Sequence, residues 1–575
     1  MTNQLQKRDR FRRILPALLG AAAGIAVFLW VYGTAPLHTG WDNWILQGYD
    51  EWDVQQHYAG WLLFRNAHWS FPLGMADTIA VPDGTVISYT DSLPWVSIFF
   101  KLLRGVLPAA FQWFGWYTLG CFALQGAAGA LLCARCVPGW KQKSAVGLLG
   151  GALFACLPTL WERAFRHTAL ASQWLFLFAM YVYLECRCTL HLTGRTPRLR
   201  WWLPVLAFVA VGIHPYFLPL VMVCALLWSI DRGRLSRDWK GAAVDFASAL
   251  AAALVGGLLC GAIGSGTSLS REGYGEFSMN LNALINPSSR GGYTWSRLLS
   301  ALPLQAGQYD GFNYLGLGVL VLLAVALVLS VVAFFRRPQA VKNWWHRNWP
   351  VAAACALLTL FAVSNHVYWG NTGFTIPLPQ WLLNLCGIFR SSGRMFYLPA
   401  ACLAVWGVYT LIGACRSLSR PAVCSGVLLA LVLAVQVWDL STVAAEKHAW
   451  FDRAMAEPVE NVAFHSMTSG IGAGHTSLLA AGEVRDDRLR LLAILAGKEG
   501  LSTNLDIAVS GSRDASAMNR ADTAALLQSG SYDPSAVYVT TDESVWLQWQ
   551  QIFAGDDALT FFVADSCYFM LCLNP

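Results

Sequence analysis

Acidic and aromatic residues gather in one segment, Tyr49–Arg65, soon after the first apolar run of the chain. Asp50 and Asp53 are candidate catalytic bases, because a carboxylate whose pKa is raised by burial toward the working pH can take a proton from a hydroxyl group. His57 and several aromatic rings stand beside them. Asp53 also has a purely structural interpretation. If the residues after it are helical, Asp53 is the N-cap and Gln56 has the spacing of a capping box. The two interpretations can both hold.

Arginines that could bind a phosphate group occur at two further places. Arg166 and His167 lie between the third and fourth apolar runs, and Arg390 and Arg394 enclose two serines and a glycine before the tenth. Arginine presents a planar fork of donors that matches phosphate oxygens. The ordinary alternatives are a surface ion pair, either of Arg163 with Glu162 or of Arg166 with an aspartate, and interfacial snorkelling of Arg390 and Arg394.

Two later segments, 273–281 and 308–316, combine aromatic rings with amide side chains. Such residues suit a sugar, whose faces stack on rings and whose hydroxyls need donors and acceptors, but they also suit an interfacial belt. Asn280, Gln308 and Asp310 are the candidate substrate-binding residues here. His214, next to a proline at a predicted hairpin apex, is a further candidate, although a lone histidine there is more often a packing residue.

Composition identifies the class of protein. Of 575 residues, 56% are hydrophobic and only 13% are charged, so a water-soluble globule is excluded. The 27 tryptophans suit long membrane–water interfaces. The basic residues lie in short loops between apolar runs, which is not a nucleic-acid pattern. The sequence contains no P-loop, dinucleotide fingerprint, HExxH motif or zinc-type cysteine spacing.

Eleven apolar runs predict about eleven transmembrane helices. Basic residues in alternate loops place the N-terminus in the cytoplasm and the chain after the last run outside, in the periplasm if the cell is Gram-negative. We therefore predict a polytopic α-helical membrane domain, residues 1–440, with a long first external loop at 34–92. Residues 441–575 carry 8 Lys and Arg against 17 Asp and Glu and predict a small external α/β domain. The predicted spans are 14–33, 109–133, 144–160, 169–189, 201–213, 216–230, 241–263, 313–335, 349–365, 395–414 and 421–440.

These motifs, in this order, resemble the GT-C class of membrane glycosyltransferases. Within that class the chain looks most like a domain-of-unknown-function family of bacterial polytopic membrane proteins. The matching residues are Asp53-x-x-Gln56-His57-x-x-Gly60-Trp61-x-x-Phe64-Arg65, His68-Trp69-x-Phe71-Pro72-Leu73-Gly74, Thr90-Asp91-Ser92-x-Pro94, Arg166-His167-x-Ala169-Leu170, the 280–287 and 308–316 segments, Phe389-Arg390-x-x-Gly393-Arg394 and, more weakly, Thr503-Asn504.

The resemblance implies inverting transfer of a sugar from a polyprenyl-phosphate donor to a glycan, lipid or protein acceptor on the external face of a bacterial inner membrane. It makes Asp53 the best match to the essential carboxylate of the first external loop, with Asp50 in reserve, and adds Arg65 and Asp91 to the substrate-binding candidates. No cofactor is required; a divalent cation is possible, but no spacing requires one. The alternatives are a transporter or flippase for lipid-linked saccharides, and an assembly partner without activity.

Overall fold

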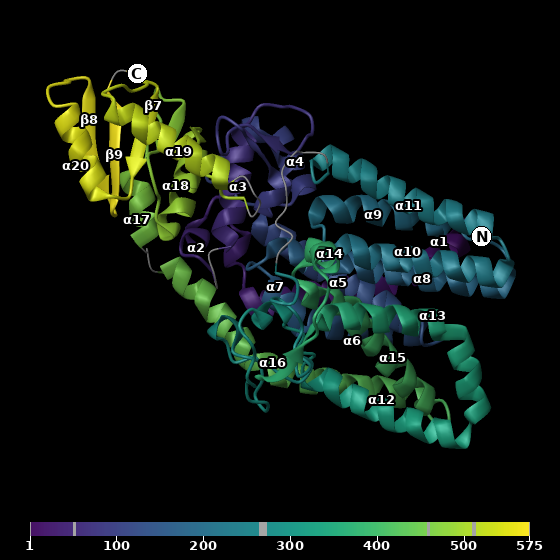
Figure 1. The fold of residues 1–575 in the computed structure, drawn as a ribbon. Helices are drawn as coiled ribbons and strands as arrows, with labels where there is room; N and C mark the ends of the chain where they lie inside the picture. The colour runs from purple at the N-terminus through teal and green to yellow at the C-terminus, as the bar shows by residue number, and fades with distance from the viewer. Residues whose placement is uncertain (1, 50–52, 264–272, 457–459, 509–512, 574) are drawn as a thin grey trace.

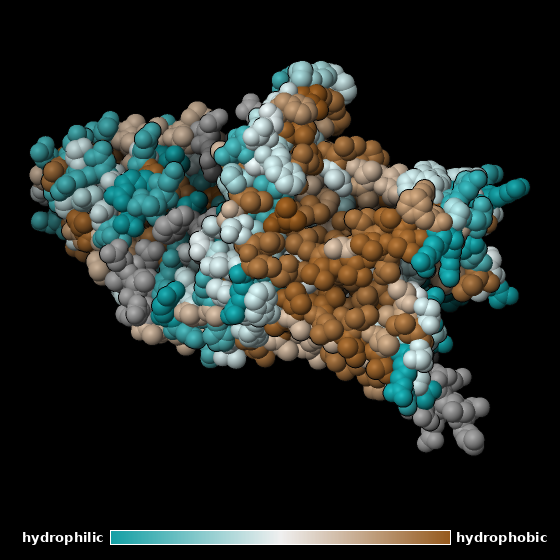
Figure 2. Space-filling model, turned by 90° about the horizontal axis from the view of Figure 1, so that it is seen from below, coloured by the Kyte–Doolittle hydropathy of each residue, from teal (hydrophilic) through white to brown (hydrophobic). Residues whose placement is uncertain are grey.

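The computed structural model describes residues 2–49, 53–263, 273–456, 460–508, 513–573 and 575. Long helices form a bundle, and a small mixed sheet with its helices stands at one end of it (Figure 1). The space-filling view shows a broad hydrophobic face between hydrophilic ends, as expected for a protein whose bundle is surrounded by lipid (Figure 2). The long helices are α1 (Thr2–Tyr32), α5 (Phe114–Ala134), α6 (Trp140–Ala155), α8 (Trp174–Thr193), α9 (Trp202–Ile213), α10 (Phe217–Ser236), α11 (Trp239–Cys260), α12 (Leu317–Arg336), α13 (Pro338–Val363), α15 (Tyr397–Cys415) and α16 (Pro421–Ala456).

Within the described residues, seven helices are long and apolar enough to cross a membrane, and the chain is a multi-pass membrane protein on that basis. The other four apolar runs coincide with α6, α9, α10 and α13. Two of these, α6 and α9, have 16 and 12 residues and are shorter than a full span, while α10 and α13 carry charged residues near one end. The count of eleven spans therefore stays a prediction.

Helices α1, α5 and α6 pack together through glycine. A Cβ atom added to Gly24 would lie 2.0 Å from the carbonyl oxygen of Phe122, and one added to Gly126 would lie 2.1 Å from that of Gly20. Backbones that approach this closely are typical of helix pairs in membranes, where small residues replace a hydrophobic driving force. The consequence is a rigid N-terminal group of helices, from whose ends the connecting segments start.

The connecting segments at the sheet end of the bundle fold into short helices and hairpins. The first of them, residues 34–113, contains the helix considered after Asp53 as α3 (Asp53–Asn66), and it also contains α4 (Pro94–Leu102). The remaining elements are η1 (Ala35–Leu37), α2 (Asn43–Leu46), β1 (Met75–Ala76), β2 (Thr85–Val86), η2 (Ile87–Thr90), η3 (Arg104–Val106), α7 (Pro158–Arg163), η4 (Thr168–Ala171), η6 (Arg290–Gly292), η7 (Gln308–Gly311), β3 (His366–Trp369), β4 (Thr372–Thr375), α14 (Gln380–Cys386), η8 (Gly387–Phe389) and η9 (Ser392–Phe396); η5 (Arg198–Trp201) lies between α8 and α9.

The C-terminal module, residues 460–575, has a five-stranded sheet in the order β6-β5-β7-β9-β8. The strands β6, β5 and β7 are parallel, and β9 pairs antiparallel with β7 and β8. The strand β7 and the terminal hairpin β8–β9 lie in the part of the chain that the sequence predicts to be a small α/β domain. The elements are α17 (Glu460–Met467), β5 (Ser477–Ala480), α18 (Asp486–Glu499), β6 (Ser502–Thr503), α19 (Arg513–Gln528), β7 (Ala536–Thr540), α20 (Glu543–Ile552), β8 (Leu559–Ala564) and β9 (Cys567–Cys572).

The module begins later than the sequence predicts. Helix α16 continues without interruption to Ala456, so the expected boundary at 440/441 lies inside a helix. The charged and polar residues after Leu440 end the apolar run, but they do not end the helix, because side chains of Asp439 and Lys447 are buried against neighbouring segments.

The module is docked on the first connecting segment. Ile79 pairs with Thr503 at the edge of the sheet, and the carbonyl of Thr78 accepts a hydrogen bond of 2.9 Å from the Thr503 amide. Helix α18 packs on α3 so closely that a Cβ on Gly497 would lie 2.6 Å from the Cβ of Leu62. The helix that carries Asp53 and His57 is thus held between the bundle and the module.

Candidate functional site

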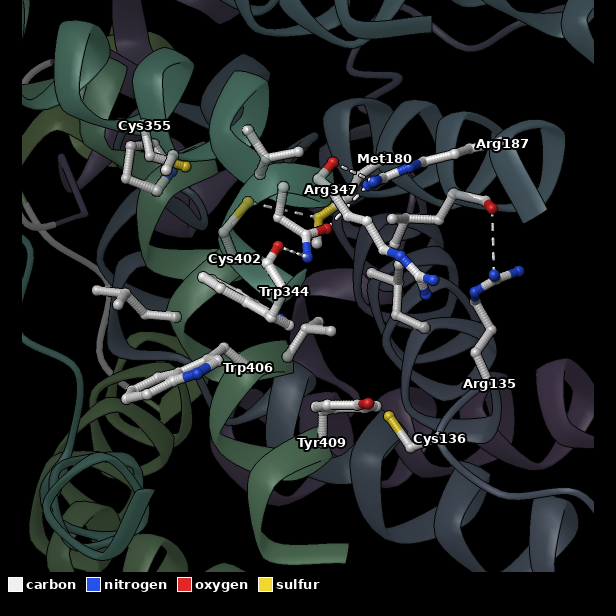
Figure 3. A pocket seen from close by; sticks show the side chains of 18 of the residues that line it. Arg135, Cys136, Met180, Arg187, Trp344, Arg347, Cys355, Cys402, Trp406 and Tyr409 are labelled. Carbon is white, nitrogen blue, oxygen red and sulfur yellow. Dashed lines mark hydrogen bonds between the residues drawn. The ribbon is translucent and has the colours of Figure 1, made fainter. Parts of the chain in front are cut away.

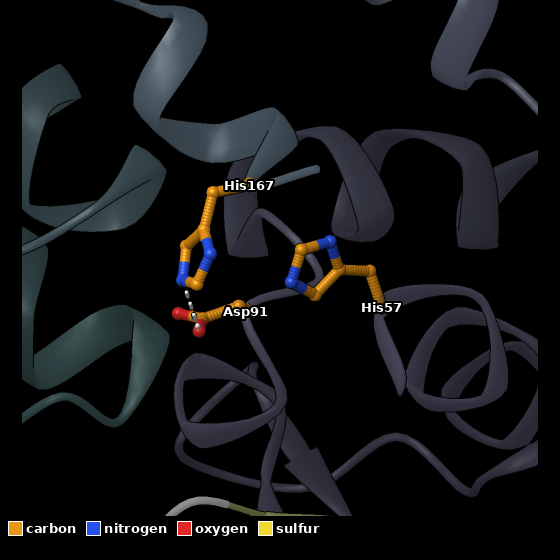
Figure 4. A group of neighbouring side chains, drawn as sticks. All are labelled: His57, Asp91 and His167. Carbon is orange, nitrogen blue, oxygen red and sulfur yellow. Dashed lines mark ion pairs between the residues drawn. The ribbon is translucent and has the colours of Figure 1, made fainter. Parts of the chain in front are cut away.

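Five residues from four separate segments meet at the sheet end of the bundle, and we call them the Asp–His cluster. His167 lies at its centre: its Nδ1 is 3.0 Å from Oδ2 of Asp53, and its Nε2 is 3.6 Å from Oδ2 of Asp91. The rings of His57 and His167 have centroids 5.6 Å apart. The Nε2 atom of His214 is 3.5 Å from Oδ1 of Asp91. Figure 4 shows His57 and His167 converging beside Asp91. All five are residues that the sequence singled out.

Local structure explains how these side chains come together. Asp53 and His57 are four residues apart on α3 and share a face of that helix. Asp91 has φ 56°, and this left-handed conformation ends η2 and turns the chain toward α4. His167 lies between α7 and η4, where Phe165 also has a positive φ of 65°. His214 ends α9, and Pro215 stands next to it at the hairpin to α10.

The titratable groups of the Asp–His cluster differ in their pKa values, and so in which of them are charged at neutral pH. Burial alone would raise the pKa of Asp53, but the hydrogen bond and charge of His167 outweigh it and lower the pKa to about 2. Asp91 has its pKa lowered in the same way, by His167 and His214 against the effect of burial. Burial lowers the pKa of His57 to about 4, whereas the two carboxylates overcome burial at His167 and raise its pKa to about 9. At neutral pH the cluster therefore holds two carboxylates around one imidazolium.

These pKa shifts predict a pH-dependent contribution to stability. His167 is charged up to about pH 9 in the folded protein but only to about pH 6.5 when unfolded, so its ion pairs stabilise fully below pH 6.5 and are lost as the pH rises through 9. We expect His167→Gln to lower the melting temperature most at pH 5–6 and least at pH 9.5. Thermal unfolding of both proteins across this range measures the difference. A constant difference at all pH values would contradict the ion-pair assignment, and His68→Gln, at an exposed Asp–His pair, is the control.

Three members of the cluster could hold a divalent cation. His57, Asp91 and His167 each offer one ligand atom, and these atoms lie within 4.8 Å of one another. The Nδ1 atom of His57 is buried and has no hydrogen-bond partner among the described residues. Two imidazoles and a carboxylate are a donor set that suits zinc, and Asp53 on the far nitrogen of His167 would orient that ligand. The sequence did not single out these three residues as a metal set, because they come from distant segments.

A second group of charges, which we call the arginine cluster, adjoins the first. Arg163 donates to Oδ1 of Asp310 at 2.7 Å, and Arg394 lies 3.0 Å from its other oxygen. The two arginines overcome the effect of burial and hold the pKa of Asp310 well below its usual range. The positive charge of Arg394 in turn disfavours protonation of both His167 and His214. The charges of the two clusters therefore interact.

Glu162 is the second carboxylate of the arginine cluster. It lies 2.7 Å from Arg163, 3.0 Å from Arg290 and 3.6 Å from Arg166. Among the described residues, four arginines thus surround two carboxylates.

Several predicted substrate-binding residues have other roles in the structure. Arg65 stands at the far end of α3 from Asp53, about 18 Å along the helix, and donates to the carbonyls of Pro108 and Leu107, among others. It fixes that loop, and a contact of Arg65 with substrate stays a prediction. Arg166 is fully buried, with its guanidinium against Gly291, and lies 3.6 Å from Glu162, so its contact with a phosphate also stays a prediction.

Asn280 and Gln308 bind each other rather than facing an opening. The Asn280 amide donates 2.7 Å to Gln308, and the Gln308 amide donates 3.1 Å to Ser278; both side chains are buried. They brace the loop on which Asp310 lies, and their contact with substrate stays a prediction. Arg390 is partly buried, with its guanidinium 5.7 Å from the centroid of the Phe277 ring. Asp50 lies outside the described residues.

The sequence indicates only an ion pair with the neighbouring Glu162 for Arg163, because its second partner, Asp310, follows 147 residues later. Tyr216 was also overlooked. Its ring lies 4.7 Å from the Arg394 guanidinium, and its hydroxyl accepts from the Ser391 amide at 2.9 Å. The signal that could have revealed Tyr216 is its position two residues after His214.

A family model described as a domain of unknown function, DUF6311, matches residues 21–441. The chain belongs to the DUF6311 family. The sequence motifs predicted membership in a domain-of-unknown-function family, and this prediction is confirmed. Among solved structures, the DUF6311 chain is similar to the oligosaccharyltransferase of Archaeoglobus fulgidus in its apo form, with a TM-score of 0.43 and 10% identity. That match covers 86% of the DUF6311 chain and 65% of the archaeal chain. The DUF6311 chain thus spans about two thirds of the length of the archaeal protein. No curated protein matches the DUF6311 chain.

Proposed function

We propose that this protein transfers a sugar from a polyprenyl-phosphate donor to an acceptor hydroxyl at the sheet end of the bundle, which we place on the external face of a bacterial inner membrane. The observation that supports this most is the adjacency of three features. The Asp–His cluster, the arginine cluster and an apolar groove meet within one region. A lipid phosphate that carries a sugar has the matching parts: a reacting carbon, an anionic leaving group and a hydrocarbon tail.

The groove lies between α10 and α13 and has a volume of about 470 Å³. Its walls are almost entirely apolar, from Trp349 at one end to Phe389 and Met395 at the other. Phe389 precedes Arg390, and Met395 follows Arg394. An isoprenoid tail in this groove would therefore place its phosphate beside two arginines.

In the proposed reaction, Asp53 takes the proton of the acceptor hydroxyl while that oxygen bonds to the anomeric carbon. The bond from this carbon to the phosphate oxygen breaks, and the polyprenyl phosphate leaves with its electrons. Its pKa of about 2 makes Asp53 a weaker base than the raised carboxylate that the sequence predicts, but Asp53 is ionised at neutral pH, its side chain is 31% exposed and its Oδ1 accepts no hydrogen bond from the described residues. His167 holds the other oxygen, and the arginines offset the negative charge that develops on the leaving phosphate.

Labelled polyprenyl-phosphate sugar in proteoliposomes tests the proposal through Arg390. We expect Arg390→Ala to weaken use of the donor by roughly 1.5–3 kcal/mol in kcat/KM, the usual loss for one charged hydrogen bond. Arg390 is the better choice for substitution, because Arg394 is tied to the buried Asp310.

Arg297→Ala is the matched control, since Arg297 is exposed in an adjoining loop. Equal kinetics for wild type and Arg390→Ala would refute the phosphate contact. If labelled lipid crosses the bilayer with its sugar intact and no polyprenyl phosphate is released, the protein is a flippase instead. If neither activity occurs, the assembly-partner alternative is favoured.

A further inference from the structure

A second and larger cavity, of about 950 Å³, runs along the bundle between α8, α13 and α15 (Figure 3). Its walls are apolar for most of their length, with Met180, Val351 and Phe396 among them. Along α13 its lining extends from Ala340 to Thr359, about 28 Å for nineteen helical residues. Such a length suits hydrocarbon chains that lie parallel to the helices.

Arginines gather at one end of this cavity. Arg135, Arg187 and Arg347 line it, and no acidic residue does so among the described residues. In Figure 3 their guanidinium groups lie near one another, with Trp406 and Tyr409 across the cavity. Asn343 and Asn348 add polar groups at the same end.

The three arginines differ in the side chains with which they pair. Arg135 pairs with Glu185, and Arg187 lies 3.1 Å from Asp231 and donates 2.9 Å to Asn348. Arg347 forms no ion pair within the described part of the chain, and its own carbonyl accepts from Arg187. The cavity thus combines an uncompensated positive charge, held at its polar end, with a deep apolar interior.

We propose that this cavity binds an anionic glycerophospholipid, with the phosphate on Arg347 and its neighbours and the acyl chains along α13 and α15. Basic pockets between transmembrane helices on the cytoplasmic side are typical sites for anionic headgroups. The donor of the proposed transfer is a poorer occupant. Arg347 stands sixteen residues, about 24 Å, before the end of α13 at Val363, so a sugar on a phosphate there could not reach Asp53.

Native mass spectrometry of the purified full chain in detergent tests the proposal, with phosphatidylglycerol and phosphatidylcholine as probes. We expect retained phosphatidylglycerol at lipid concentrations that leave phosphatidylcholine unbound. Arg347→Gln should weaken binding about five- to tenfold, the effect of one arginine near a lipid surface. Arg195→Gln changes an exposed arginine on the same side and outside the cavity, and should leave binding unchanged.

A second variant tests the apolar part. Ala352→Phe places a ring in the cavity without altering any charge, and it should lower phosphatidylglycerol binding while the protein keeps its elution volume and melting temperature. Inorganic phosphate at the same concentration should not compete. Equal binding of both phospholipids, no effect of either variant, or tighter binding of polyprenyl phosphate than of phosphatidylglycerol would each overturn the assignment.

Discussion

Asp53→Asn is expected to reduce sugar transfer by about 100- to 10,000-fold, because an amide cannot take the proton that a general base removes. The protein should still fold and insert. The amide oxygen can accept the His167 Nδ1–H bond, and Asp53 is the first residue of α3, where loss of its charge costs the helix at most about 1 kcal/mol. Single-turnover release of polyprenyl phosphate measures the effect directly.

Asp77→Asn is the matched control for this variant. Asp77 also pairs with a histidine, at 2.8 Å from His68, but both groups are exposed and lie outside the Asp–His cluster. Its substitution should leave transfer nearly unchanged. If Asp50→Asn stops transfer and Asp53→Asn does not, the base is misassigned. If Asp53→Asn lowers the rate and the affinity for zinc together, Asp53 acts by orienting His167 as a metal ligand.

Asp310→Asn should cost about 3–5 kcal/mol in the free energy of unfolding, because it leaves Arg163 and Arg394 buried without the carboxylate between them. Denaturant titration in mild detergent, followed by tryptophan fluorescence, gives this value. The variant should also lose transfer, since Arg394 adjoins the groove.

The comparison for Asp310 is Asp487→Asn, whose carboxylate pairs with Arg485 on the surface of the C-terminal module. An exposed pair contributes at most about 1 kcal/mol. Asp310→Glu retains the charge and should recover part of the stability. A loss below 1 kcal/mol for Asp310→Asn would mean that the arginine cluster contributes little to the fold.

The sequence predicted the helices well, because apolar runs of span length and turn residues between them are local signals. It also selected all five members of the Asp–His cluster. Charged and imidazole groups that sit between apolar runs are costly unless they have partners, so residue type and position alone point to them. The pairing within the cluster was not predictable: Asp53 and His167 are 114 residues apart, and their contact depends on the packing of α3 against the bundle.

Three of the candidate residues make loop contacts that have a common physical origin. Arg65, Asn280 and Gln308 lie in motifs with chemically suitable side chains, yet each serves backbone or amide groups of nearby loops. A long irregular segment buries many peptide groups that need donors and acceptors, and polar side chains meet that need. Sequence pattern cannot separate a residue that braces a loop from one that faces a ligand.

The continuous helix α16 has a consequence for how the sequence of this protein can change. Asp439 and Lys447 are buried on this helix, eight residues apart. Asp439 accepts a hydrogen bond from the Tyr314 hydroxyl, and Lys447 donates one to the Tyr49 hydroxyl. Each residue added to an α-helix advances its angular phase by about 100° and its length by about 1.5 Å. Adding or removing a single residue between these two anchors would turn one of them away from its partner and would shift the module that rests on α3. Substitutions at the solvent-facing positions of this stretch leave that phase intact, so the number of residues in it is under a stricter constraint than their identity.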